Sequence, residues 1–188
     1  MKKTVFLFLF LMAWISGTRA QDAVQPEYRT VEFYLGVQPG LLPVPFDEFG
    51  RYAFDVNVVP LTIEYAFNAH WALRIHSIWD VQFRPEFPAV FSKAGVELTL
   101  PYYLPARSNE IGHRGLYAGP LVSPVYDRLN NYYELRIGAE GGYAFLFGNQ
   151  WSLALAGQVG LNLQFDPKNP FMRTIPYSLP RISFGLWF

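Results

Sequence analysis

Residues 151–165 read WSLALAGQVGLNLQF, and their side chains alternate in polarity with a period of two. Large apolar residues hold most of the odd positions from Trp151 to Phe165, whereas Ser, Ala, Gln, Gly and Asn hold the even ones. Because successive side chains of a β-strand point to opposite faces, the pattern predicts a strand with one oily and one small, polar face. The stretch is longer than the ~9–11 residues that a tilted strand needs to cross a bilayer.

The same alternation recurs along the chain. It predicts eight strands, at residues 30–38, 54–67, 71–84, 91–103, 115–126, 132–147, 151–165 and 177–188. The weakest of these predictions is 115–126, because its two prolines cannot donate to a strand ladder. The expected fold is all-β: an eight-stranded antiparallel up-and-down transmembrane β-barrel, porin-like in fold class.

The links between the predicted strands differ in length. Those at 68–70 and 148–150 are tight, whereas those at 40–53, 85–89 and 166–175 are longer and richer in Pro or polar residues. Outer-membrane barrels have short periplasmic turns and longer outer loops, and an even strand count returns both termini to the periplasm. The tight turns are therefore assigned to the periplasmic side. The link at 106–114 is longer than this rule predicts.

The oily face is expected to point outward. Alternation alone also fits a soluble periplasmic lipid-binding barrel, whose apolar face points inward and whose polar face meets water. A water-facing sheet normally carries many Lys and Glu side chains, but the polar face of 151–165 carries no charge. Small residues suit the narrow interior of an eight-stranded barrel. The soluble barrel stays as an alternative.

The N-terminus resembles a cleaved secretory signal. Lys2 and Lys3 precede an apolar run from Val5 to Ile15, and a small residue, Ala20, ends the segment. The run is too short for a membrane-spanning helix, which needs ~20 apolar residues. We expect residues 1–20 to be a signal peptide and residues 21–188 to form one barrel domain in the outer membrane of a Gram-negative cell envelope.

Composition narrows the function further. The chain has no cysteine, a formal net charge of zero and 18% aromatic residues. The absence of cysteine excludes a disulfide framework and thiolate metal sites, and the balanced charge gives no indication of nucleic-acid binding. The three histidines show no metal-ligand spacing, so neither a metal nor another cofactor is expected.

The last strand carries a sharper motif. Ile182, Phe184, Leu186 and Phe188 alternate with less apolar positions, and the chain ends on the aromatic Phe188. Here the sequence resembles small, uncharacterised members of the bacterial outer-membrane β-barrel family, and residues 138–143 add a weaker match. The resemblance implies that these four residues form the signal read by the barrel-assembly machinery. It also implies periplasmic chaperones during biogenesis and outer-membrane lipids as partners.

The charges on inward faces are nearly balanced in sign. Together with His76 they predict a polar lumen network made of Glu32, Glu64, Arg74, His76, Asp80, Glu97, Glu134, Arg136, Glu140 and Arg181, with Arg84 and Lys93 on the same faces. Enclosed charges must be paired, since an isolated charge out of water costs several kcal/mol. We therefore expect a plugged lumen, and not a channel.

Catalysis is the alternative to a structural role. Some eight-stranded outer-membrane barrels modify lipid A with His, Ser and an acid, and His76-Ser77 is the only adjacent pair to consider. Neighbours on a strand point to opposite faces, so the two cannot form a nucleophile–base hydrogen bond. His70 and His113 are expected in solvated links. No catalytic residue is predicted, and the expected function is a membrane anchor that displays surface loops.

The surface loops remain the candidate for contacts with a partner. Residues 41–46 are unusually apolar for a loop, which fits a segment that covers the barrel mouth, contacts lipid or docks an unidentified partner.

Overall fold

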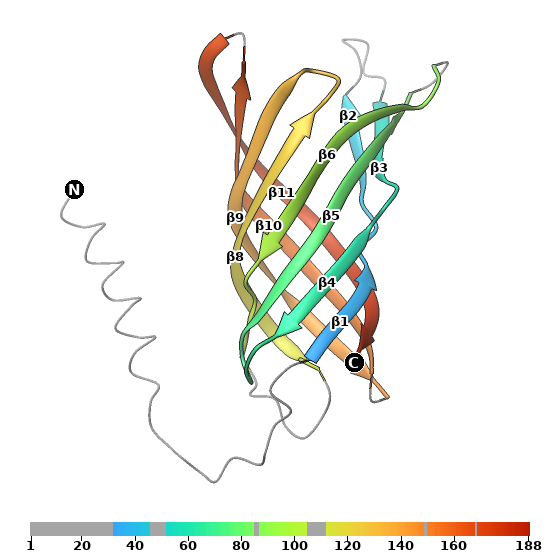
Figure 1. The fold of residues 1–188 in the computed structure, drawn as a ribbon, viewed down its shortest axis with the longest axis vertical. Helices are drawn as coiled ribbons and strands as arrows, with labels where there is room; N and C mark the ends of the chain where they lie inside the picture. The colour runs from blue at the N-terminus through green and yellow to red at the C-terminus, as the bar shows by residue number, and fades with distance from the viewer. Residues whose placement is uncertain (1–31, 46–51, 85–86, 105–111, 149, 168) are drawn as a thin grey trace, which may run out of the picture.

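A computed structural model describes residues 32–45, 52–84, 87–104, 112–148, 150–167 and 169–188. The predicted signal peptide, 1–20, lies outside the described residues. The described chain is built from β-strands in one sheet that curls into a closed barrel (Figure 1). No helix in this part of the chain is long and apolar enough to cross a membrane.

The sheet contains eleven segments. In chain order they are β1 (Glu32–Val37), β2 (Leu41–Pro45), β3 (Tyr52–Asn57), β4 (Leu61–Ala66), β5 (Ala72–Phe83), β6 (Val90–Thr99), β7 (Tyr102–Tyr103), β8 (Gly115–Asp127), β9 (Tyr132–Phe147), β10 (Trp151–Asp166) and β11 (Asn169–Trp187).

Three pairs of segments each form one interrupted barrel strand. Strands β3 and β4 both pair with β5, β6 and β7 both pair with β8, and β1 and β2 pair with β4 and β3 in turn. The eleven segments therefore make eight barrel strands, each antiparallel to its neighbours, and β1 closes the ring against β11. The predicted eight-stranded, antiparallel, up-and-down architecture is confirmed.

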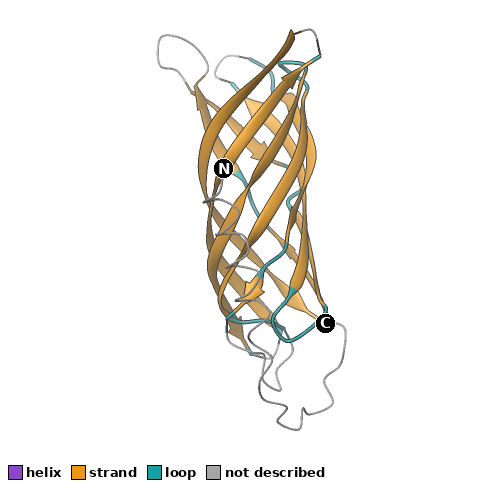
Figure 2. Cartoon of the chain, turned by 90° about the vertical axis from the view of Figure 1, so that its left-hand side faces the viewer, coloured by secondary structure: helices purple, strands orange, loops and turns teal. Residues whose placement is uncertain are grey.

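The barrel has two distinguishable ends. Strand β1 begins and β11 finishes at one end, here called the terminal end, which also holds the tight turns before β5 and before β10 (Figures 1 and 2). The turns that join β5 to β6, β8 to β9 and β10 to β11 lie at the opposite end, the hairpin end. Both described chain ends of the barrel thus lie together, as an even number of strands requires.

Two predicted links are strands instead. The segment 166–175 was expected to be a loop, but β11 already begins at Asn169 and pairs with β10 from there. Leu41–Pro45 was expected to be an apolar loop, but it forms β2, which pairs with Tyr52–Val56 of β3. Phe46 lies outside the described residues. Prolines in both segments resemble loop signals, and this is why both predictions were wrong.

The prolines of β11 are tolerated because of the side to which they point. The backbone N–H of Phe188 donates to the oxygen of Phe33 on β1, at 2.7 Å. Even-numbered N–H groups of this segment therefore face away from β10, since N–H direction alternates along a strand. Pro176 and Pro180 occupy even positions, so they remove no donor from the long ladder between β10 and β11.

The two faces of the barrel wall differ sharply in charge. Every charged residue within a described strand holds an inward position of that strand: Glu32, Asp55, Glu64, Arg74, Asp80, Lys93, Glu97, Asp127, Glu134, Arg136, Glu140, Asp166, Arg173 and Arg181. Asp166 and Arg173 are exposed, at the tip of the β10–β11 hairpin. The outward positions hold exposed apolar side chains instead, such as Val159 at 58% and Leu161 at 48%.

Candidate functional site: the polar lumen

Arg74 is the centre of a buried ion-pair cluster near the terminal end. Its Nε donates to Glu64 Oε2 and its Nη1 to Glu140 Oε1, each at 2.6 Å. The three side chains come from β5, β4 and β9, and each is at most 5% exposed. One arginine thus bridges carboxylates from different parts of the barrel wall, which charge-assisted hydrogen bonds of this length make strong.

Two tyrosines complete this terminal-end cluster, defined as Glu64, Arg74, Tyr103, Tyr117 and Glu140. The Tyr103 hydroxyl donates to Glu64 Oε1 at 2.8 Å, and the Tyr117 hydroxyl donates to Glu140 Oε1 at 3.0 Å. Both hydroxyls also accept hydrogen bonds from Arg74, whose guanidinium carbon lies 5.0 Å from the Tyr117 ring centroid. The tyrosines satisfy buried charges while they fill space, as the interior of a narrow barrel requires.

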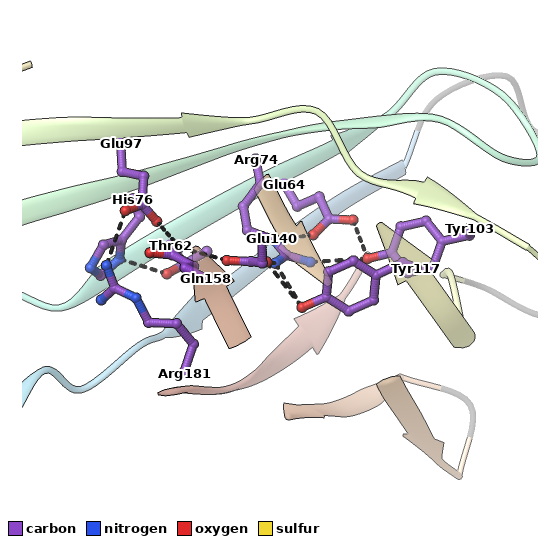
Figure 3. A network of polar contacts seen from close by, with 10 residues as sticks. All are labelled: Thr62, Glu64, Arg74, His76, Glu97, Tyr103, Tyr117, Glu140, Gln158 and Arg181. Carbon is purple, nitrogen blue, oxygen red and sulfur yellow. Dashed lines mark hydrogen bonds and ion pairs between the residues drawn. The ribbon is translucent and has the colours of Figure 1, made fainter. Parts of the chain in front are cut away.

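The cluster extends along the lumen through a glutamine. The Gln158 amide donates to Glu140 Oε2 at 2.7 Å and to Glu97 Oε1 at 2.8 Å, and Glu97 pairs with Arg181 at 3.0 Å (Figure 3). Gln158 therefore bridges two carboxylates that would otherwise repel each other. The polar side chains form a chain of contacts across the lumen, from β4 and β5 to β11.

His76 is held within the same lumen by neutral partners. The Asn57 amide lies 3.2 Å from Nε2, and Thr62 Oγ1 lies 3.0 Å from Nδ1. Because the Asn57 amide is a donor, Nε2 accepts and Nδ1 carries the proton that Thr62 accepts. Both ring nitrogens are thus engaged in contacts that hold the wall together.

Ser77 points to the opposite face from His76, as the strand period predicts. Its hydroxyl donates to the backbone oxygen of Val59 and accepts from the N–H of Leu61 at 3.2 Å. These backbone groups lie at the interruption between β3 and β4, where the Leu61 N–H also donates to the Val59 oxygen at 2.8 Å. Ser77 therefore repairs the backbone of the outer face, and it does not face His76.

The terminal end of the lumen is closed by stacked rings. The His113 ring lies 4.3 Å from that of Tyr103 at an interplanar angle of 8°, and the Trp187 ring meets His113 edge-on at 5.7 Å. His113 was expected to be solvated, but it is only 1% exposed. That prediction was wrong because the chain turns into the barrel just before β8, which no local sequence pattern indicates. His70, also expected in solvent, is half-buried against Tyr102.

Gly112 makes this closure possible. Its φ of +90° favours glycine, and a Cβ added there would lie 2.5 Å from the Trp187 ring. Its N–H donates to Glu32 Oε2 at 2.6 Å. The Glu32 carboxylate on β1 therefore also holds the segment that carries His113 in place. Of the predicted link 106–114, residues 106–111 lie outside the described residues.

A second ionic cluster lies nearer the hairpin end. Lys93 Nζ lies 3.1 Å from Glu134 and 3.7 Å from Asp127, and Arg136 pairs with Glu134 at 3.0 Å. We call Lys93, Asp127, Glu134 and Arg136 the hairpin-end cluster. Its cations are more exposed than Arg74, with side-chain exposures of 18% for Lys93 and 10% for Arg136.

The structure places the predicted network inside the barrel, but only Glu64, Arg74 and Glu140 belong to the terminal-end cluster and only Glu134 and Arg136 to the hairpin-end cluster. Buried there are Glu32, Glu64, Arg74, His76, Asp80, Glu97, Glu134, Arg136 and Glu140. Arg181 and Arg84 are half-buried. Asp80 belongs to neither cluster; its backbone oxygen accepts a hydrogen bond from Ser92 at 3.0 Å.

The buried lumen residues that carry contacts but were not predicted include Asp55, Tyr103, Tyr117 and Asp127. Asp127 and Tyr117 share the odd positions of β8, which the prolines of that segment obscured. Neither tyrosine was assigned to a face of its strand. Only the alternation of odd and even positions along each strand, followed residue by residue, distinguishes a lumen residue from an outer-face residue.

The arrangement provides rigid charge pairing across the lumen. Among the residues that the structure describes, no three His, Asp or Glu side chains are grouped as a metal site requires. Comparison of the chain with protein-family models, with curated proteins and with solved structures found no match.

Proposed function

We propose that this chain is an integral outer-membrane β-barrel protein with a plugged, charge-paired lumen that anchors and displays surface loops. The observation that carries the proposal is the inward position of every charged residue within the described strands. A barrel in water would solvate its charges, whereas a barrel in hydrocarbon must enclose and pair them. The lumen contacts of Arg74 and Lys93 meet that requirement.

Aromatic side chains at both ends of the outer surface support the same proposal. At the terminal end, Trp151 stacks on Phe184 at 5.0 Å, and at the hairpin end Tyr126 contacts Tyr133 at 5.2 Å. On β10 the aromatic residues Trp151 and Phe165 are 14 residues apart. At ~3.3 Å per residue and a ~45° tilt, that separation is roughly 30 Å, the thickness of a bilayer core.

The closed terminal end favours an anchor over a pore. The rings of Tyr103, His113 and Trp187 pack against one another at the terminal end of the lumen, where Tyr103 also belongs to the terminal-end cluster. An eight-stranded barrel has little interior beyond what its side chains fill. We therefore expect no conductance of porin size in planar bilayers.

We further propose that the protein is not an enzyme. The lipid A-modifying alternative needs a serine activated by a histidine, and both ring nitrogens of His76 are already engaged. Release of fatty acid from lipid A by the purified protein, with loss on His76→Ala, would contradict this.

The biogenesis partners are also a proposal. The outward residues Ile182, Phe184 and Leu186 lie on β11, and Phe184 and Leu186 pair with the closing strand β1. This position supports the role that the family resemblance implies for these residues and Phe188: recognition of the last strand by the barrel-assembly machinery and by periplasmic chaperones.

A pair of arginine substitutions on one face of β10 tests the membrane assignment. Val159→Arg, near the middle of the outer face, should lower the free energy of unfolding by ~2–4 kcal/mol, and Phe165→Arg, near one edge, by ~0–1 kcal/mol. Both are measured by urea unfolding in phospholipid vesicles.

Phe165→Arg is the control for Val159→Arg. The two substitutions introduce the same charge on the same face of the same strand, and they differ in depth and in the side chain removed. Cell fractionation and heat-dependent gel mobility would accompany the measurement. Equal effects of the two substitutions, or recovery of a folded, freely soluble monomer, would contradict the proposal.

A further inference from the structure

The outer face is hollowed near the hairpin end. A groove of about 410 Å³ crosses strands β6, β8, β9 and β10. Its outward side chains are Ala94, Pro124, Tyr126, Tyr133, Leu135 and Phe165. The volume falls within the ~300–1,000 Å³ range of small-molecule sites, although this one lies on the surface expected to meet lipid.

The groove follows from the side chains around it. Ala94 lies opposite Tyr126 in the β6–β8 ladder, and Pro124 is the next outward residue on β8. These short side chains form the floor, while the rings of Tyr126, Tyr133 and Phe165 stand around them. Small residues next to rigid aromatic ones thus leave a groove that is apolar along its length.

A cation lies directly beyond the outer edge of the groove. Arg128 follows β8 on the outward side, two residues after Tyr126, and it is exposed. The charged residues within the described strands hold inward positions, whereas Arg128 is an exposed charge just past the outer face. In the membrane orientation of the proposed function, its charge would lie at the level of the lipid headgroups.

The turn that carries Arg128 is well fixed. The Asp127 carboxylate accepts from the Asn130 N–H at 2.9 Å, and the Arg128 N–H donates to the Ser92 oxygen at 2.8 Å. The Tyr126 hydroxyl donates to Asn131 Oδ1 at 2.9 Å, which ties the groove wall to the same turn. The backbone of Arg128 is therefore held relative to the groove before any ligand binds, which lowers the entropic cost of binding.

We propose that the groove binds an acyl chain of a phosphorylated glycolipid of the lipid A class, and that Arg128 contacts its phosphate. The inference rests on the proposed function, in which the hairpin end faces the outer leaflet. The apolar groove takes the hydrocarbon, and an exposed guanidinium binds a phosphate oxygen through charge-assisted hydrogen bonds. The occupant is thus defined by an acyl chain and an anionic phosphate on one molecule.

Native mass spectrometry of the folded, purified protein in detergent micelles tests the proposal. Lipid A and enzymatically dephosphorylated lipid A are the probes, and the ratio of lipid-bound to free protein is the readout. The wild-type chain should retain lipid A about tenfold better than the dephosphorylated form, since hydrogen bonds to charged groups are worth that much. Arg128→Gln should reduce retention of lipid A to the dephosphorylated level.

A second variant tests the groove separately from the charge. Ala94→Leu fills the floor of the groove and should lower retention of both lipids. Ala139→Leu makes the same change at an outward position of β9 outside the groove, and Arg173→Gln removes an exposed arginine at the β10–β11 hairpin. Both controls should retain lipid A like the wild type.

The outcomes separate this inference from the proposed function. Heat-dependent gel mobility and vesicle insertion, measured first, report whether the chain is a membrane barrel at all. If it inserts but Arg128→Gln retains lipid A like the wild type, or Ala139→Leu weakens retention as much as Ala94→Leu, the groove is not the site. If it does not insert, both proposals fail together.

Discussion

The two ionic clusters of the lumen use the same chemistry in different surroundings. In the terminal-end cluster, Arg74 and its carboxylate partners are at most 5% exposed and two tyrosines occupy the remaining space. In the hairpin-end cluster, Lys93 is 18% exposed. The first is built from a planar guanidinium with fixed donors, the second partly from a flexible ammonium.

The difference separates a desolvated cluster from one whose cations are partly exposed. A desolvated ion pair depends on every partner, because removal of one leaves an uncompensated charge in a low-dielectric site. A pair within reach of water loses little, because solvent replaces the missing partner. We therefore expect the stability of this barrel to depend mainly on its terminal half.

The largest effect should come from Arg74→Met, which leaves Glu64 and Glu140 buried without their cation. We expect the free energy of unfolding to fall by ~3–5 kcal/mol, measured by urea unfolding in vesicles. A loss below about 1 kcal/mol would mean that water enters the terminal end and that the two clusters do not differ.

An intermediate effect is expected for Glu140→Gln. The carboxylate accepts from Arg74, Tyr117 and Gln158, and an amide of the same shape cannot accept from all three. The loss should be ~1–3 kcal/mol in the same assay. Glu134→Gln is the matched control in the hairpin-end cluster, and it should cost less; a larger cost there would reverse the comparison.

The smallest effect should follow Lys93→Met. Lys93 is 18% exposed, and its buried partner Glu134 keeps a second cation, Arg136, at 3.0 Å, so the expected loss is only about 1 kcal/mol. Because Lys93 is partly exposed, salt screens its pairs more than those of Arg74, so the wild-type and Lys93→Met unfolding curves should converge further at high NaCl concentration. A loss comparable to that of Arg74→Met would show that the hairpin end is sealed as well.

Most of the architecture could be predicted because strand period and barrel closure are local rules. The alternation in 151–165 and its repeats locate the strands, and parity alone assigns Glu140 or Arg136 to the lumen. Errors occurred where a proline stands in a paired strand. Pro176 and Pro180 resemble loop residues, and only the direction of their absent N–H groups, which depends on the neighbouring strand, makes them compatible with β11.

The clusters themselves could not be predicted to the same degree. Which carboxylate meets Arg74 depends on the stagger between strands, and the sequence contains no direct record of that stagger. The burial of His113 depends on a chain reversal that brings it between Tyr103 and Trp187. Parity thus predicts which residues are enclosed, whereas their pairing requires the three-dimensional register.

The seam between the first and last strands differs from the other junctions. Strand β11 pairs with β10 over nearly its whole length but with β1 only from Phe184 to Trp187, and no ladder between β2 and β11 occurs in the residues described. Hairpins of consecutive strands bring together residues close in sequence and form quickly, whereas this junction joins opposite ends of the domain. We expect the β1–β11 pairing to form last during folding and to separate first when the barrel is pulled apart by mechanical force.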